Sequence, residues 1–465
     1  MNNNSICDSP LLESALRRSV QYLSGLPERR VWPAPEALRE LSRFDTELPR
    51  NPMDAESVLA LLDSAGSPAT VATAGGRYFG FVMGGSLPVT VAANWLAAAW
   101  DQNPVMAVTS PVGARLEEVA SRWLLEILGL PPQSGVGFVG CDTIAIFVAL
   151  AAARRALLLR EGWDVDAQGL FGAPPIRIIV SEETHIAVHK ALGLLGLGRE
   201  RVVRIPADSQ GRIRADALPE ALAPPVPTLV CIQAGNVNSG SFDDAAAICH
   251  IAHQHNAWVH VDGAFGIWAA AAPGRAHLAS GVANADSWSF DAHKWLNVPY
   301  DSGIVAVREA RYLSESMSGD AAYLQRGTRD PGFLTPGMST RARGIEVWAA
   351  LAALGRSGVA DLVERTCRHA ARFAEGLRAA GYEILNDVVI NQVLVSFGHD
   401  ITTRAVIAAL QTEGTCWCGG TLWHGRAAMR ISVSCWATTN EDVERSLDAM
   451  IRVARECKTQ AAAAD

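Results

Sequence analysis

A lysine just beyond an apolar run has the clearest potential for chemistry in this sequence. Lys294 follows Ser287–Phe290 closely and stands between His293 and Trp295, which is an unusual place for a solvated charge. One interpretation is an ordinary surface lysine. The functional interpretation is an amine that forms imines, with its pKa lowered by partial burial.

Two further polar residues also follow apolar runs. Asp262 ends the run Trp258–Val261 and is followed by small residues, and His185 comes soon after Ile176–Val180. Ligands of open α/β sheets bind at the carboxyl ends of the strands, so both residues are candidates for a site. The alternatives are an aspartate that caps the next segment and a hydrogen-bonded structural histidine. A buried aspartate would need a cationic partner or several donors.

A glycine-rich segment offers a possible phosphate site. Gly135, Gly137 and Gly140 match the pattern GxGxxG, but prolines rather than a strand precede the first glycine, which argues against a dinucleotide fingerprint. We interpret residues 137–139 as a strand, Gly140 as a turn, and Asp142-Thr143 as the start of a helix. A helix N-terminus can bind phosphate, although the same pattern also fits an ordinary capped helix, and Asp142 is an unfavourable neighbour for an anion.

The histidines and cysteines give no metal pattern. His250, His253 and His255 form HxxHxH, but positions 253 and 255 do not share a helical face, and no spaced carboxylate or cysteine completes a zinc site. The nine cysteines are scattered, with only a CxC pair at Cys416 and Cys418. We therefore predict no metal and a reducing location, the cytoplasm.

Composition excludes several classes of protein. The 465 residues are 49% hydrophobic and 19% charged, with a net charge of −8, which indicates a globular chain without a nucleic-acid-binding surface. The longest apolar run, Ile144–Ala153, is about half of a membrane span, and the first residues do not resemble a secretory signal. We expect neither a membrane nor a nucleic acid as partner.

The elements that must position these residues alternate along the middle of the chain. Continuously apolar runs typical of strands buried on both faces alternate with helical patterns, which favours a mostly parallel sheet covered by helices. The expected strands are 137–139, 176–180, 202–205, 228–232, 258–261, 287–290 and 303–307, and the helices between them are 185–197, 216–222 and 243–255.

The two ends of the chain differ from its middle. Residues 1–75 predict helices at 11–23 and 55–65 joined by proline-rich loops, too broken for a core of their own, so we expect them to pack on a second subunit. Residues 76–345 form the large domain. Residues 346–465 predict a small α+β domain, with helices at 346–354, 359–380, 403–412 and 440–458 and strands at 382–386, 392–397 and 428–434.

Taken in chain order, the phosphate turn, the histidine, the aspartate and the lysine resemble the pyridoxal-phosphate-dependent group II amino acid decarboxylases, the relatives of aromatic-amino-acid and glutamate decarboxylases. The resemblance spans about residues 52–449. Its most specific segment is DAHKWLNVPYDSG at 291–303, supported by HVDGAFG at 260–266 and AGNVNSGSFDD at 234–244. It implies a fold type I transferase: a mostly parallel seven-stranded sheet with helices on both faces, a small α+β C-terminal domain, and a homodimer with active sites at the interface.

The resemblance also implies roles for the cofactor-binding residues. Lys294 would hold pyridoxal 5′-phosphate as an internal aldimine, Asp262 would keep the ring nitrogen protonated, and His185 would stack on the ring. The other cofactor-binding residues expected are Asp142, Thr143 and His293 at the phosphate, Ala264 beside the ring, and Asn236 and Asp291. The substrate-binding residues expected are Tyr78, Phe79, Phe333, Leu334 and Arg430, of which Arg430 matches an arginine that often meets a substrate carboxylate.

Three departures from the family pattern keep the reaction open. The phosphate turn reads GCDTIAIF, where relatives more often have a small uncharged turn. The segment HIAVHK at 185–190 lacks the serine that relatives place after the histidine. The loop 325–337 has no tyrosine, whereas a loop tyrosine is thought to protonate the reacting carbon in many relatives; Phe333 and Leu334 lie in that region and Tyr323 lies earlier.

Three hypotheses follow. The first is decarboxylation of an L-amino acid to the amine and CO2 through an external aldimine and a quinonoid. The second keeps the cofactor but changes the outcome to oxidative deamination by an aldehyde synthase, or to carbon–carbon lyase chemistry, as the missing tyrosine suggests. The third is a non-enzymatic relative that binds a partner, against which the retained Lys294 and Asp262 argue. The sequence does not identify the amino acid.

Overall fold

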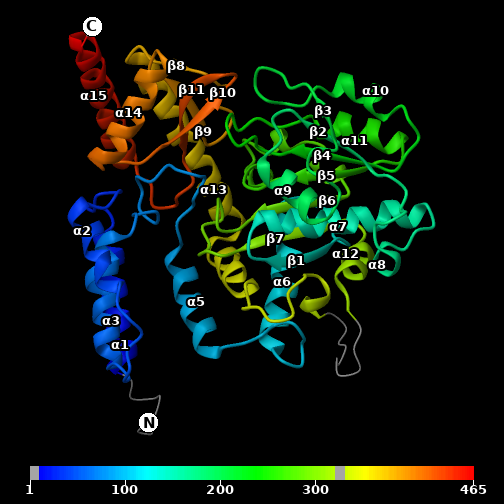
Figure 1. Ribbon diagram of the computed structural model, residues 1–465, viewed down its shortest axis with the longest axis horizontal. Helices are drawn as coiled ribbons and strands as arrows, with labels where there is room; N and C mark the ends of the chain where they lie inside the picture. Colours follow the sequence, from blue (N-terminus) through cyan, green and yellow to red (C-terminus); the bar gives the residue numbers. More distant parts are fainter. Residues whose placement is uncertain (1–9, 320–329, 465) are drawn as a thin grey trace.

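The computed structural model describes residues 10–319 and 330–464 (Figure 1). Its α-helices are α1 Pro10–Gly25, α2 Pro35–Glu40, α3 Ala55–Leu61, α4 Ser67–Ala69, α5 Pro88–Trp100, α6 Pro111–Ile127, α7 Asp142–Arg160, α8 Val165–Gln168, α9 Ile186–Leu194, α10 Leu218–Leu222, α11 Ala245–Gln254, α12 Ala310–Met317, α13 Gly344–Ala379, α14 Asp400–Glu413 and α15 Asn440–Ala464. Its short 3-10 or π turns are η2 Leu41–Phe44, η3 Leu62–Gly66, η4 Ala215–Ala217, η5 Gly266–Ala271, η6 Ala276–Ala279, η7 Val282–Asn284 and η8 Pro331–Phe333.

A seven-stranded sheet forms the centre of the large domain, as predicted. Its strands are β1 Gly135–Val139, β2 Arg177–Ser181, β3 Val202–Ile205, β4 Thr228–Gln233, β5 Trp258–Asp262, β6 Ser287–Asp291 and β7 Gly303–Val307. Their order is β1-β7-β6-β5-β4-β2-β3, and β7 runs antiparallel to the other six strands, which are parallel to one another. The prediction of a mostly parallel sheet is therefore confirmed.

Helices cover both faces of this sheet, so successive side chains of one strand pack into two different hydrophobic cores. In β2, Ile178 packs into the core formed with α7, α9 and α12, whereas Ile179 packs into the core formed with α6, α11 and α13. Strands buried on both faces read as continuous apolar runs, which is why the sequence pattern located them. Burial of this kind contributes about 25 cal/mol per Å² of apolar surface.

The GxGxxG match is explained by packing. Gly135 and Gly137 lie inside β1, so they form no phosphate loop. A Cβ on Gly137 would lie 2.6 Å from the carbonyl oxygen of Leu334, so glycine is required for the close approach of that backbone. The predicted order of strand, turn and helix is confirmed here, with α7 beginning at Asp142.

A second, antiparallel sheet follows α13. It consists of β8 Glu383–Ile384, β9 Gln392–Ser396, β10 Gly419–Trp423 and β11 Arg426–Ser432, in the order β10-β11-β9-β8. The sequence pattern missed β10, whose two glycines weaken its strand signal. The small α+β unit is confirmed, while the exact divisions at residues 75 and 345 stay predictions.

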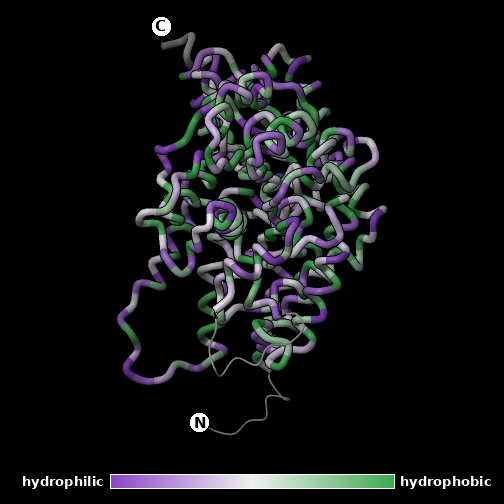
Figure 2. The backbone as a smooth tube through the Cα atoms, turned by 90° about the vertical axis from the view of Figure 1, so that its right-hand side faces the viewer, coloured by the Kyte–Doolittle hydropathy of each residue, from purple (hydrophilic) through white to green (hydrophobic). Residues whose placement is uncertain are grey.

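Helices α1 and α3 lie at the lower left of Figure 1, whereas α15 lies at the upper left, and Figure 2 shows hydrophilic and hydrophobic residues alternating along the backbone. Helices α1 and α3 pack on each other, with Arg18 of α1 paired to Glu56 and Asp63 at 2.9 and 2.7 Å. One face of α1 is apolar and exposed. Among the described residues, no helix is both long and apolar enough to cross a membrane.

Candidate active site

Lys294 lies just beyond the carboxyl end of β6, at the edge of the central sheet. Its Nζ is 3.0 Å from Oδ2 of Asp291, the last residue of β6, and only 18% of its side chain is exposed. The backbone carbonyl of Lys294 accepts a hydrogen bond from the Asn297 amide at 3.2 Å. Gly84 passes so close that a Cβ on it would lie 1.7 Å from that carbonyl oxygen. The side chain of Lys294 is therefore held by a buried carboxylate, and its backbone is held by the close approach of Gly84, where only glycine fits.

Asp262 ends the neighbouring strand β5, where the sequence predicted it. It pairs in register with Gln233 of β4 and Ser289 of β6, and it is buried. Its Oδ1 accepts a hydrogen bond from the Ala264 amide at 3.1 Å. Strand pairing thus brings Asp262 and Asp291 to the same sheet edge as Lys294.

His185 immediately precedes α9, and its Nδ1 accepts a hydrogen bond from the Ala187 amide at 3.4 Å. Burial lowers the pKa of His185, an effect that Asp262 opposes and the cations of Lys294 and Arg430 reinforce. The imidazole is therefore neutral near pH 7. These electrostatic partners come from β5, β11 and the loop after β6, so the structure brings the predicted histidine, aspartate, lysine and arginine together.

The electrostatics of Lys294 correct one sequence prediction. We expected partial burial to lower the pKa of this amine. Burial does act in that direction, but the carboxylates of Asp291, Asp142 and Asp262 outweigh it and raise the pKa of Lys294 to about 12. Without a bound group, Lys294 is a charged ammonium, because three acidic side chains from three elements converge on it.

The N-terminus of α7 faces the same region. Asp142 and Thr143 are its first two residues, and Asp142 is buried beside Asp262 and Asp291. His293 accepts a hydrogen bond on Nδ1 from the Ser302 amide at 3.2 Å, and its Nε2 lies 3.5 Å from Oδ2 of Asp291. The N-terminus of this nineteen-residue helix supplies free N–H groups and a positive dipole, both of which favour the binding of an anion.

Unsatisfied buried atoms at this edge fit a bound group. Buried polar atoms normally have partners, yet several here have none among the described residues. The atoms are Thr184 Oγ1, Asp142 Oδ1, Asn236 Nδ2, Asp291 Oδ1 and Ser302 Oγ. Four of these residues belong to segments around Lys294. The fifth, Asn236, accepts hydrogen bonds on its Oδ1 from two backbone amides of its own turn, at 2.8 and 3.1 Å. An acid beside a ring nitrogen, an amine for an imine and a helix N-terminus for a phosphate together fit pyridoxal phosphate.

Aromatic side chains gather around Tyr78 and Tyr300, and the sequence predicted only part of this group. Tyr78 stacks on Trp417 with ring centroids 5.1 Å apart, and Phe81 stacks on the same indole at 5.5 Å. Tyr300 lies over His293 with centroids 4.2 Å apart. Burial raises the pKa of Tyr300 to about 12, with Lys294 lowering it and Asp291 raising it.

The sequence analysis did not predict Trp417, Phe81 or Tyr300 as site residues. Tyr300 belongs to the most specific matched segment, and that position is the one signal that could have found it. Trp417 meets Tyr78 through a backbone bridge between segments far apart in the chain, for which a single sequence holds no signal.

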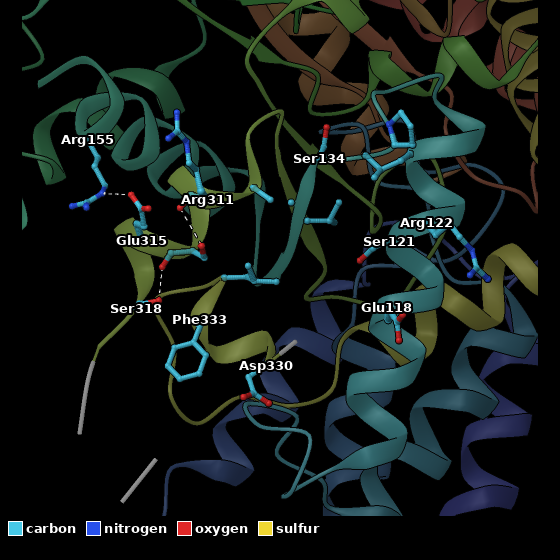
Figure 3. A pocket seen from close by; sticks show the side chains of 17 residues that line it. Glu118, Ser121, Arg122, Ser134, Arg155, Arg311, Glu315, Ser318, Asp330 and Phe333 are labelled. Atoms are coloured by element: carbon cyan, nitrogen blue, oxygen red, sulfur yellow. Dashed lines mark hydrogen bonds and ion pairs between the residues drawn. The ribbon is translucent and has the colours of Figure 1, made fainter. Parts of the chain in front are cut away.

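Three predicted substrate residues lie elsewhere. Phe79 is buried in the small-sheet core, edge-on to Phe373 at 5.0 Å. Phe333 and Leu334 line a cavity of about 820 Å³ beside β1 and α12 whose lining includes none of the residues around Lys294 (Figure 3). Their contact with substrate stays a prediction, while the structure gives Phe79 a packing role.

Arg430 lies on β11, opposite Gly419 of β10, and donates a hydrogen bond to the Val237 carbonyl at 2.9 Å. Burial lowers the pKa of its guanidinium. In the part of the chain that the structure describes, no group of histidine, cysteine or acidic side chains has a geometry that could hold a metal. His253 instead pairs with Asp286 at 3.1 Å.

Comparisons with known proteins agree with this geometry. Among curated proteins, tryptophan decarboxylase 1 of Oryza sativa subsp. japonica is 26% identical over 411 residues, covering 80% of this chain and 79% of the relative. Aromatic-L-amino-acid decarboxylase of Rattus norvegicus is 27% identical, covering 80% and 81%.

Solved structures show the same fold. The crystal structure of Oryza sativa TDC with PLP and tryptamine superposes with a TM-score of 0.90 at 22% identity, covering 98% of this chain and 99% of that one. Mouse CSAD superposes with a TM-score of 0.88 at 21% identity, covering 97% and 99%. Both likenesses identify the fold type I architecture.

The model of the pyridoxal-dependent decarboxylase conserved domain matches residues 35–399, well over half of the 465 residues. By this match, the chain belongs to the pyridoxal-dependent decarboxylase family.

Proposed function

We propose that this enzyme, whose cofactor is pyridoxal 5′-phosphate, releases the α-carboxylate of an L-amino acid as CO2 and forms the amine. The observation that carries the proposal is the convergence of Lys294, Asp262 and His185 at one sheet edge, with Lys294 and Asp291 only 3.0 Å apart. When bound, the cofactor supplies an electron sink for the electrons of the broken bond.

Each residue of this group has a distinct task in the proposal. Lys294 would hold the cofactor covalently, and its amine would make way for the amine of the substrate. Asp262 would hold a proton at the ring nitrogen, and the neutral His185 would cover the ring face. The amide groups at the start of α7, together with Thr143 and His293, bind the phosphate. Arg430 would bind and orient the substrate carboxylate, because it is a buried cation close enough to lower the pKa of His185.

An aromatic amino acid is the substrate class that the site supports best. Tyr78, Phe81 and Trp417 form a continuous stack, and Phe81 is 58% exposed, so a flat side chain could add to it. The tryptophan and aromatic-amino-acid decarboxylases among the relatives support the same class.

The proton that completes the reaction comes from a tyrosine in this proposal. The described part of the loop, residues 330–337, has no tyrosine, and Tyr323 lies outside the described residues. Tyr300 stands beside Lys294 and keeps its proton at neutral pH, because the pKa of its hydroxyl is raised to about 12. Protonation of the reacting carbon by Tyr300 gives the amine and protects that carbon from oxygen.

A homodimer is part of the proposal. Leu12, Leu16, Val20 and Leu23 lie on one face of α1 at helical spacing and are 39–63% exposed. On α5, Trp95, Leu96 and Trp100 are 40–55% exposed. Contiguous apolar surface of this kind is characteristic of protein interfaces. The cytoplasmic location expected from the cysteines stays a prediction.

The first experiment compares the wild type with Lys294→Ala. We expect a visible absorbance band of the bound cofactor that borohydride fixes to the wild-type chain and that the variant lacks. A panel of aromatic and acidic amino acids is then assayed for amine, CO2 and oxygen uptake. Stoichiometric amine and CO2 without oxygen uptake support the proposal. Oxygen uptake with aldehyde and peroxide would replace it with an aldehyde synthase.

A further inference from the structure

Buried acidic groups outnumber cations around Lys294. Asp142, Asp262 and Asp291 are each at most 5% exposed, and they come from α7, β5 and β6. Lys294 pairs with Asp291 at 3.0 Å and is the one lysine on which all three act. An unpaired carboxylate is costly to bury, so a site of this composition favours carrying one of its acids in the neutral form.

Asp142 is the acid that the geometry selects. Its Oδ1 is buried without a hydrogen-bond partner among the described residues, and it is the first residue of α7. Burial raises the pKa of Asp142 well above its ordinary value, with Asp262 and Asp291 adding to the effect and Lys294 and a hydrogen bond with Ser289 opposing it.

The histidines and arginines near this turn do not balance a negative charge on Asp142. His185 and His293 both have lowered pKa values, mainly through burial, so neither adds a cation near neutral pH. On the outer side, a Cβ on Gly140 would lie 2.8 Å from Oδ2 of Asp301. Asp301 itself is paired with arginines from the segment before α13. These are Arg341 at 3.0 Å and Arg343 at 2.8 Å.

A phosphate that binds at the N-terminus of α7 therefore meets Asp142 directly. The amide groups of the first turn favour an anion, whereas a carboxylate on the first residue repels it. A protonated carboxyl group removes that repulsion, and its O–H can donate a hydrogen bond to a phosphate oxygen.

We propose that Asp142 binds the cofactor phosphate as a neutral carboxylic acid, donating its proton in a hydrogen bond, so that phosphate and proton occupy the site together. The proton stays on Asp142 and no covalent bond changes. The proposal concerns only cofactor binding, so it holds whichever amino acid is the substrate and whichever product forms.

The test compares two cofactor forms on the full-length apoprotein. Pyridoxal 5′-phosphate and pyridoxal, which lacks the phosphate, are titrated by visible absorbance between pH 6.5 and 10. The ratio of the two dissociation constants isolates the phosphate contribution, because imine formation at Lys294 is common to both ligands.

In the wild type, the preference for the phosphate form should be constant at lower pH. It should then fall by up to tenfold per pH unit above the pKa that Asp142 has in the apoprotein, because binding must then supply a proton. In Asp142→Asn, which is neutral at every pH, the preference should not change over that range. The control is Asp400→Asn, an exposed aspartate at the first position of α14, which should retain the wild-type profile.

Calorimetry provides a measurement that needs no variant. Heats of binding in buffers of different ionisation enthalpy should show the wild type taking up more protons with the phosphate form than with pyridoxal at alkaline pH, by up to one. A preference that is constant from pH 6.5 to 10, an equal profile in Asp142→Asn, or equal proton uptake for the two ligands would each overturn the proposal.

Discussion

Replacing Gly84 with alanine tests the position of Lys294 most directly. The added methyl would lie 1.7 Å from the Lys294 carbonyl oxygen and 2.9 Å from its carbonyl carbon. Ordinary carbon–oxygen contact begins at about 3.3 Å, so the two groups would have to separate by about 1.6 Å. Gly84 has no positive φ, so the obstacle is steric contact alone, chiefly with the Lys294 backbone and also with Nδ2 of Asn297 at 3.0 Å.

The Lys294 carbonyl cannot retreat easily. It accepts the Asn297 amide at 3.2 Å, and Asn297 is fully buried, donating from Nδ2 to the Trp295 and Ser434 carbonyls at 2.9 and 3.0 Å. Overpacking of this kind costs about 1–3 kcal/mol. A displacement of about 1 Å at a reacting group can lower the rate on the order of 100-fold.

We therefore expect Gly84→Ala to fold with a lowered melting temperature, to bind cofactor with an altered absorbance band, and to lose roughly 100-fold in kcat for amine formation. Gly193→Ala is the matched control, because a Cβ there meets nothing within 4 Å. It should keep the wild-type absorbance band and kcat, with a melting temperature equal to or slightly above that of the wild type, because alanine favours the helix α9 more than glycine does. A Gly84→Ala protein with the wild-type band and a kcat within a factor of two would refute the placement of Lys294 beneath this segment.

Three further predictions follow from the same structure. Burial lowers the pKa of His260 to about 4, so the unfolded chain binds a proton at higher pH than the folded one, and stability should fall as pH drops from about 6.5 to 4. Urea unfolding should show His260→Gln losing about 3 kcal/mol less than the wild type across that window, and equal losses would contradict the assignment. Tyr300→Phe should raise the ratio of aldehyde to amine severalfold with oxygen uptake, and an unchanged ratio would remove Tyr300 as the proton donor. Trp417→Ala disrupts the stack with Tyr78 and Phe81 that a substrate ring would join, and one such ring contact is worth about 0.5–1.5 kcal/mol, so KM for aromatic amino acids should rise about tenfold. A rise of the same size for non-aromatic substrates would mean that the stack has only a structural role.

Much of the central sheet was predictable from the sequence because both of its faces are buried. Strands covered on both sides consist of continuous apolar runs, and each run places the next polar residue at the sheet edge. That logic located Asp262 and Lys294 at the ends of β5 and β6, and Asp142 at the start of α7. Weaker patterns did not predict their elements: β10 begins with two glycines, and α5 and α6, which begin at Pro88 and Pro111, were not predicted although proline is common at the first position of a helix.

The sequence by itself determined which residues stand at the ends of strands, because side-chain periodicity and chain punctuation are local properties. Only the tertiary structure decided their charge and their contacts. The pKa of Lys294 is raised because acids from α7, β5 and β6 converge on it, and no local pattern records that sum. The same holds for Trp417, which stacks on Tyr78 across more than three hundred residues of chain, and for Phe79, whose ring the small-sheet core takes up. Packing between distant elements sets these properties, so they appear only once the chain is folded.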